Sequence, residues 1–177
     1  DSRTGDIYVF CNFATGRLRG TTFTEVLAPL AGRATGQNGP VAYDSTRHRF
    51  LLAGGQYAHH HVYDITANTN SAITFTGAQA SAVENAAAGS ALEYVPALDV
   101  YLMMPANGSG GTIYQINAST WACTTFSTTG GGSVPSTAND DGTAPNGPYG
   151  KFRYIPRLKG CVYVPRHNAG VWFLRVH

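Results

Sequence analysis

Three short polar segments of the chain carry side chains that can bind or transform polar ligands. They are residues 56–61 (Gln-Tyr-Ala-His-His-His), 107–109 (Asn-Gly-Ser) and 166–168 (Arg-His-Asn). Their amide, imidazole, phenol and guanidinium groups can hydrogen-bond the hydroxyls of a sugar or hold a carboxylate. We therefore expect a ligand-binding site made of Tyr57, His59, His60, Asn107, Arg166, His167 and Asn168.

The same segments hold the groups that a polysaccharide lyase needs. Cleavage of a uronate-containing polymer requires a base and a group that neutralises the uronate carboxylate. The candidate bases are Tyr57 and His59, and the candidate neutralising groups are Arg166 and His167. The sequence contains no nucleophile elbow, phosphate-binding loop or HExxH zinc motif. Because of these candidate bases and neutralising groups, a polysaccharide lyase activity is the alternative to ligand binding alone.

The histidine run 59–61 and the three cysteines are the potential metal ligands of the sequence. If His61 begins a strand, successive side chains point to opposite faces, so at most two of the three imidazoles can converge. Cys11, Cys123 and Cys161 have no CxxC spacing and lie in apolar or Thr-rich runs, so we expect buried thiols in strands without a bound metal. We expect no metal site and no cofactor.

Charge and composition exclude several classes of partner. The 177 residues include 12 Lys and Arg and 10 Asp and Glu, for a net charge of +2. This balance gives no electrostatic surface for nucleic acid or for an anionic membrane, and no apolar run approaches the ~20 residues of a membrane span. The 43% hydrophobic content indicates a folded domain with a real core.

One pattern recurs four times: a β-branched residue, an aromatic residue, any residue and a large apolar residue. The copies begin at Ile7, Val62, Ile113 and Val171. A small polar turn and a Thr-Phe pair follow the first three copies, ending at Phe23, Phe75 and Phe126. Each of these copies therefore predicts a strand, a turn and a second strand.

A second pattern precedes the last three copies and predicts another hairpin. Its strands surround Tyr43, Tyr94 and Tyr154, and Tyr43 and Tyr94 are 51 residues apart. Four strands in about 50 residues are typical of a β-propeller blade. We therefore expect an all-β fold, a single β-propeller domain over residues 1–177 built from four-stranded antiparallel blades, with a β-sandwich as the alternative. The expected blades span residues 1–23 (third and fourth strands only), 40–75, 91–126 and 150–177, with one helical turn at most, at residues 83–88.

The closing segment Tyr149-Gly-Lys-Phe-Arg-Tyr-Ile-Pro156 and the pair Gly54-Gly55 carry a resemblance to a known family. With the repeats, they resemble kelch-like, galactose-oxidase-type β-propellers of secreted bacterial proteins. The resemblance implies a secreted or periplasmic protein. It leaves three functions open: carbohydrate binding, a polysaccharide lyase, and a protein-interaction scaffold.

The predicted strands fill only about three blades, which is fewer than the four to eight of natural propellers. We therefore expect a partial ring whose partner is a missing N-terminal half or a second copy of the chain, with a carbohydrate as ligand. The longer connections lie between blades, at residues 24–39, 76–89 and 127–149, and between second and third strands, at 53–59, 105–110 and 165–169. In a propeller these connections share one face, which is where we place the ligand site.

Glu93 and Arg153 occupy the same register of consecutive innermost strands, one residue before the repeated tyrosine. A partly buried glutamate is costly unless it is paired, and a guanidinium can hold a carboxylate with two hydrogen bonds. We therefore predict that Glu93 and Arg153 meet between neighbouring blades. The alternative is that Arg153 points into the central channel and holds an acidic ligand.

Overall fold

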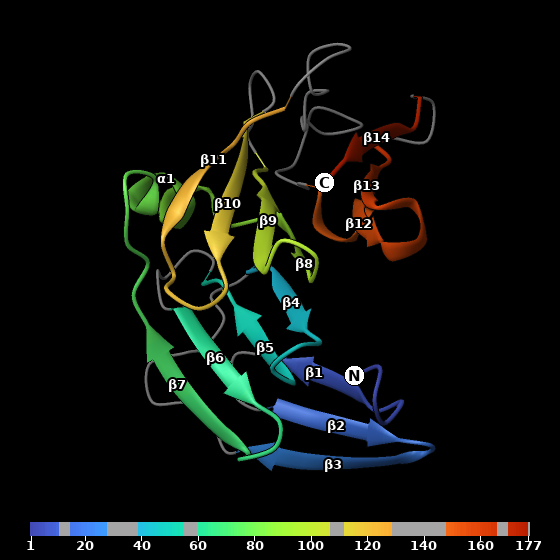
Figure 1. Ribbon diagram of the computed structural model, residues 1–177. Coiled ribbons are helices and arrows are strands. Elements are labelled where there is room, and N and C mark those ends of the chain that lie inside the picture. The colour runs from blue at the N-terminus through green and yellow to red at the C-terminus, as the bar shows by residue number, and fades with distance from the viewer. Residues whose placement is uncertain are drawn as a thin grey trace, which may run out of the picture.

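The computed structural model describes residues 1–10, 15–27, 39–54, 60–106, 112–128, 148–165 and 170–176. These residues form four antiparallel sheets, which confirms the all-β class (Figure 1). The first sheet contains β1 (Ile7–Phe10), β2 (Thr15–Arg19) and β3 (Thr22–Leu27). The second contains β4 (Val41–Asp44), β5 (Arg49–Leu52), β6 (His60–Asp64) and β7 (Thr69–Ile73). The third contains β8 (Ala91–Val95), β9 (Val100–Met104), β10 (Ile113–Asn117) and β11 (Cys123–Phe126). The fourth contains β12 (Phe152–Ile155), β13 (Gly160–Tyr163) and β14 (Trp172–Arg175).

The strands of each sheet pair in chain order, so every sheet is a simple meander. The strands expected in the second, third and fourth repeats are all present. The first sheet differs, because it has three strands where two were expected. β2 begins at Thr15, within the turn expected at residues 14–16, and a further turn follows between Arg19 and Thr22, where Gly20 takes a φ of +59°. Gly16 is accommodated inside β2 because the Phe23 ring occupies the space that a side chain would fill.

The hairpins of the repeats share an unusual backbone feature. The residue before each second strand has a left-handed conformation, with φ of 55° at His48, 54° at Asp99 and 50° at Lys159. A non-glycine residue adopts this conformation rarely, so three occurrences at one repeat position reflect a shared turn geometry. The internal repeat therefore extends to the backbone.

The third strands β6, β10 and β14 are equivalent in the structure, but β6 is offset by two residues from the alignment that the sequence pattern gave. The carbonyls of His48, Asp99 and Lys159 accept hydrogen bonds from the N–H groups of Ile65, Ala118 and Val176, respectively. Tyr63 is therefore equivalent to Ile116, two residues after the Tyr114 that the sequence pattern had aligned with it. Because side chains alternate with a period of two, this shift leaves every residue on its expected face.

Consecutive sheets pack through their faces, with their first strands side by side. β4 lies beside β8, and β8 lies beside β12 (Figure 1). One core cluster between the second and third sheets includes Leu51 and Tyr101, and another between the third and fourth includes Leu102 and Phe152. Aromatic rings of the first sheet pack on Phe50 of the second.

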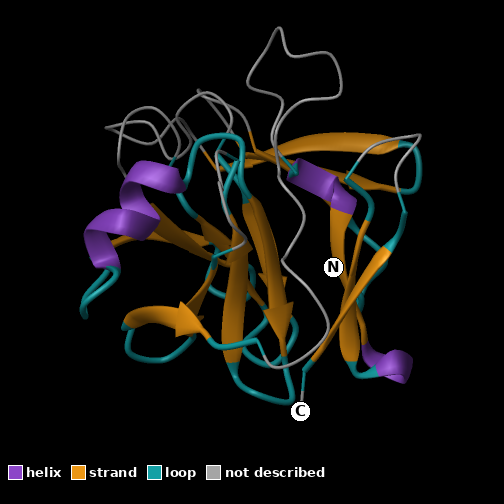
Figure 2. Cartoon of the chain, turned by 90° about the horizontal axis from the view of Figure 1, so that it is seen from above, coloured by secondary structure: helices purple, strands orange, loops and turns teal. Residues whose placement is uncertain are grey.

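The helical segments are short and separate from one another (Figure 2). The longest is α1 (Ala80–Ala86), which is longer than the single turn expected at residues 83–88. It forms because Val83 is fully buried in the core between the second and third sheets, which stabilises a helix too short to persist alone. The others are the 3-10 turns η1 (Tyr149–Lys151) and η2 (Pro156–Leu158). No helix within the described part of the chain is long and apolar enough to cross a membrane.

Candidate functional site

Most of the expected ligand-binding residues fall outside the described part of the chain. This applies to Tyr57, His59, Asn107, Arg166, His167 and Asn168, and so to all four candidate catalytic groups. His60 alone is placed by the structure. The strands that flank these segments are β5 and β6, β9 and β10, and β13 and β14, as the repeat predicts.

His60 is buried instead of lining an exposed rim. It is the first residue of β6, its ring stacks on Phe75 at 4.2 Å, and its Nδ1 accepts the N–H of Gly54 at 3.0 Å. An Nδ1 that accepts a hydrogen bond carries no proton, so the Nε2 of the neutral ring bears it. This Nε2 lies 3.7 Å from Oε1 of Glu84 on α1. His60 therefore lies next to the helix that follows the second sheet.

The expected alternation of the histidine run, which allows at most two of its three imidazoles to converge, is confirmed for its two described members. His60 and His61 are both buried and, as successive strand residues, point to opposite faces of the second sheet. Within the described residues, no group of three His, Cys, Asp or Glu side chains is arranged to hold a metal ion.

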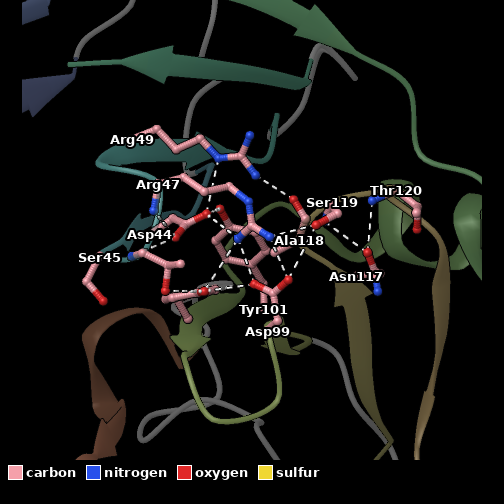
Figure 3. A network of polar contacts seen from close by, with 12 residues as sticks. Asp44, Ser45, Arg47, Arg49, Asp99, Tyr101, Asn117, Ala118, Ser119 and Thr120 are labelled. Carbon is pink, nitrogen blue, oxygen red and sulfur yellow. Dashed lines mark hydrogen bonds and ion pairs between the residues drawn. The ribbon is translucent and has the colours of Figure 1, made fainter. Parts of the chain in front are cut away.

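The densest polar network joins the first hairpins of the second and third sheets (Figure 3). At its centre is Asp44, whose side chain is fully buried at the end of β4. Its Oδ1 accepts the backbone N–H groups of Thr46 and Arg47, which shapes the turn into β5. Its Oδ2 accepts Nη1 of Arg47 at 3.1 Å, Nε of Arg49 at 3.1 Å and the Tyr101 hydroxyl at 3.3 Å. Both carboxylate oxygens are therefore saturated.

Arg47 reaches from the second sheet to a second carboxylate on the third. Its Nη1 and Nη2 each donate to one oxygen of Asp99 at 2.6 Å, and Nη2 also donates to the Ser119 hydroxyl at 2.6 Å. The Tyr94 hydroxyl donates to Asp99 at 2.9 Å. The hydrogen bonds from Arg47, opposed by partial burial, lower the pKa of Asp99 to about 2.

Arg49 completes the contact between these two sheets. Its guanidinium lies 4.8 Å from the Trp121 ring centre, and its Nη2 donates to the Ala118 carbonyl at 2.5 Å. Burial raises the pKa of Tyr101, which keeps its hydroxyl protonated beside Asp44. The carboxylates of this network are occupied by donors from both sheets, so the network holds the second and third sheets together.

The predicted meeting of Glu93 and Arg153 is confirmed. Nη1 of Arg153 donates to Oε1 of Glu93 at 2.7 Å, and the other oxygen accepts the backbone N–H of Tyr154 at 3.4 Å. Glu93 is only 16% exposed whereas Arg153 is 66% exposed, so the pair is half wet. Burial raises the pKa of Glu93, and Arg153 offsets part of that rise. Arg153 is thus engaged by a protein carboxylate, which disfavours the alternative of an acidic ligand in the channel.

Cys123 and Cys161 are buried in strands as predicted, whereas Cys11 lies outside the described residues. Burial raises the pKa of Cys123 to about 11 and that of Cys161 to about 12, so both remain thiols at neutral pH.

The sequence reasoning missed the Asp44–Arg47–Asp99 network and the Glu84 neighbour of His60. The Asp44 turn had a local signal, since Asp caps its own turn. Asp99, the partner of Arg47 on the third sheet, lies 52 residues further along the chain, a separation that no local pattern spans. Neither a family model nor a curated protein matches the chain.

Proposed function

We propose that the four sheets are consecutive parts of a kelch-like β-propeller and that the chain is a binding module for a carbohydrate polymer. The propeller arrangement is supported by the simple meanders, by the shared hairpin geometry and by the lateral contacts of β4 with β8 and β8 with β12. Sheets that repeat in this way and touch through their first strands are what a propeller requires.

The observation that carries the binding function is the difference between the two ends of the sheets. At one end, the short hairpins are closed by the saturated network of Asp44, Arg47 and Asp99. The longer connections leave the strands at the other end, and their sequences carry the Tyr, His, Asn and Arg residues suited to sugar hydroxyls and carboxylates. We place the ligand at this long-connection end, around Tyr57, Asn107 and Arg166.

The faces of the first and last sheets support a partial ring. Ile7, Val9 and Phe23 are exposed on the first sheet, and Val171 and Phe173 on the last. The equivalent faces of the inner sheets are buried against a neighbour. In the proposed ring, further sheets of the same repeat cover these faces. The alternative is that a second copy of the chain covers them, and a measurement of the mass in solution would detect that dimer.

Retention on immobilised polysaccharides tests the binding function. We expect retention on a polyuronate such as alginate or on a neutral β-glucan, without new absorbance from an unsaturated product. Arg166→Gln should weaken retention. The matched control is Arg157→Gln, because Arg157 lies in the turn between β12 and β13, whereas Arg166 follows β13 in the sequence.

Three outcomes decide among the functions. Unsaturated product would replace the binding module with a lyase, and Tyr57, His59 and His167 would then be its first catalytic candidates. No retention on either polymer would favour a protein-interaction scaffold. Equal losses for Arg166→Gln and Arg157→Gln would refute the assignment of the ligand to the long-connection end.

A further inference from the structure

A histidine in the first hairpin of the second sheet joins a buried carboxylate to an exposed hydroxyl. His48 lies in the turn between β4 and β5, and its Nε2 lies 2.9 Å from Oδ2 of Asp1. Its Nδ1 lies 3.2 Å from Oγ1 of Thr66, in the turn between β6 and β7. A carboxylate that orients an imidazole, and an imidazole within reach of a hydroxyl, are the arrangement that activates a nucleophile.

The surroundings of Asp1 fix the proton on one nitrogen of His48. The Asp1 carboxylate is buried, and it also accepts the hydroxyls of Tyr43 and Thr4 at 2.8 Å each. An ionised carboxylate only accepts hydrogen bonds, so Nε2 of His48 carries the proton. In the neutral ring, Nδ1 then accepts the Thr66 hydroxyl. This nitrogen is therefore placed to take the hydroxyl proton.

The positive charge of Arg3 lies close to this base. Its Nη2 donates to the Ser45 carbonyl at 3.0 Å, which holds the guanidinium against the hairpin that contains His48. Burial lowers the pKa of His48, and the charge of Arg3 lowers it further. The amino group of Asp1 acts in the same direction and the carboxylate of Asp64 in the opposite one. His48 is therefore neutral at pH 7, the state in which it acts as a base.

The repeat holds a second hydroxyl at the same place without this arrangement. Ser119 is the repeat equivalent of Thr66, and Asp99 is that of His48. Ser119 accepts Nη2 of Arg47 and lies beside the Asp99 carboxylate, whose pKa is about 2. A carboxylate with so low a pKa is too weak a base to activate a hydroxyl at neutral pH. Ser119 is therefore a matched control that keeps the hydroxyl and lacks the base.

We propose that Thr66 and His48 form a catalytic site for the hydrolysis of carboxylic esters, with Asp1 as the positioning residue of the base. The Thr66 oxygen attacks the carbonyl carbon while Nδ1 of His48 takes the hydroxyl proton. The tetrahedral intermediate expels the alcohol, which takes that proton from His48, and the acyl group remains on Thr66. The guanidinium of Arg3 supplies positive charge near the developing oxyanion.

A water molecule completes the reaction. Its oxygen attacks the acyl carbon while Nδ1 of His48 takes one of its protons. The Thr66 oxygen then leaves with that proton, and the carboxylic acid is released. Because Thr66 is exposed at a turn, the substrate is a small ester or an ester carried on the outside of a larger molecule. This site lies at the short-hairpin end of the sheets, so the inference is independent of the carbohydrate ligand.

Hydrolysis of p-nitrophenyl acetate by the full chain tests the proposal. We expect Thr66→Ala and His48→Gln each to lower kcat/KM at least about tenfold, since a positioned base contributes about 10²–10⁴-fold. Thr66→Ser should retain activity, and the control Ser119→Ala should hydrolyse at the parent rate. After quenching in acid, peptide mass spectrometry of the parent chain should find the acetyl group on Thr66.

The pH dependence tests the base and its positioning residue. The parent rate should rise with pH through one ionisation, with a midpoint below the ordinary histidine pKa of about 6.5, because only the neutral ring takes the proton. Asp1→Asn removes a negative charge that favours the charged ring, so we expect the midpoint to move to lower pH. An unchanged midpoint would overturn the role of Asp1.

The acetyl group on the parent chain keeps the test valid even if a variant folds poorly, which circular dichroism detects. The proposal is overturned if the parent is no faster than free imidazole at equal concentration. It is also overturned if Thr66→Ala hydrolyses at the parent rate, or if Ser119→Ala loses as much activity. An acetyl group found on His48 and not on Thr66 would make the imidazole itself the nucleophile and contradict the mechanism.

Discussion

Asp44→Asn is the substitution that most directly probes how neighbouring sheets are held together. The carboxylate is fully buried, and its two oxygens accept five hydrogen bonds. An asparagine has one acceptor oxygen and one amide nitrogen. If the oxygen faces the N–H groups of Thr46 and Arg47, the nitrogen must face the guanidinium donors of Arg47 and Arg49. If the side chain is reversed, the nitrogen faces the two backbone donors instead.

Either orientation places donor against donor in a buried site and removes the charge that Arg49 contacts. Removing one partner of a buried ion pair typically costs about 3–5 kcal/mol. Arg47 keeps Asp99 and Arg49 keeps the Ala118 carbonyl, so we expect about 3 kcal/mol, at the lower end of that range.

The assay is urea unfolding at pH 7, followed by tryptophan fluorescence and circular dichroism. The matched control is Asp64→Asn, because Asp64 also ends a strand before a turn but is partly exposed and accepts an exposed hydrogen bond, from the N–H of Ala67 at 2.8 Å. That substitution should cost less than about 1 kcal/mol. If the two variants lose the same free energy of unfolding, the network does not hold the sheets together.

Three further predictions concern charges and thiols. Because Asp99 has a pKa of about 2 in the folded protein, its stabilising contribution is present above pH 4 and is lost as the pH falls toward 2. Unfolding measured across that range should show the difference in free energy of unfolding between wild type and Asp99→Asn shrinking by about 1 kcal/mol, a small value because the side chain is 43% exposed. Burial raises the pKa of Glu93, so its ionisation costs stability as the pH rises above the ordinary pKa of a glutamate, and Glu93→Gln should be neutral or slightly stabilising at pH 7. A double-mutant cycle with Arg153→Met should give a coupling of about 1 kcal/mol in the free energy of unfolding. Additive effects of the two substitutions would contradict the pairing. Cys123 and Cys161 should resist a thiol reagent at pH 8 in the native protein and react after unfolding in urea. Rapid labelling of either residue in the native protein would show that it is not buried.

The sequence predicted the parts of the fold that depend on local periodicity. Alternation of apolar residues located the strands of the second to fourth sheets, and the shared position of Glu93 and Arg153 was sufficient to predict their contact. The register of the third strands could not be predicted, because a two-residue shift leaves the alternation unchanged. The third strand of the first sheet was missed, because Gly16 looks like a turn residue until Phe23 is seen to cover it.

The candidate site was predictable only as a set of residue types at equivalent places in the repeat. His60 shows the reason: its sequence context, beside two other histidines, suggests an exposed polar rim. Its environment depends on Phe75, Gly54 and Glu84, and the last of these lies on a helix that only tertiary packing stabilises.

Hydrogen exchange with and without bound polysaccharide tests the central claim most directly, namely that one end of the sheets binds ligand while the other end holds the sheets together. With the polymer that retains the chain, we predict protection confined to the ends of β5, β9 and β13 and the starts of β6, β10 and β14. The hairpins at residues 44–49, 95–100 and 155–160 should exchange at unchanged rates. Protection centred on those hairpins, or none at the long-connection end, would contradict the account.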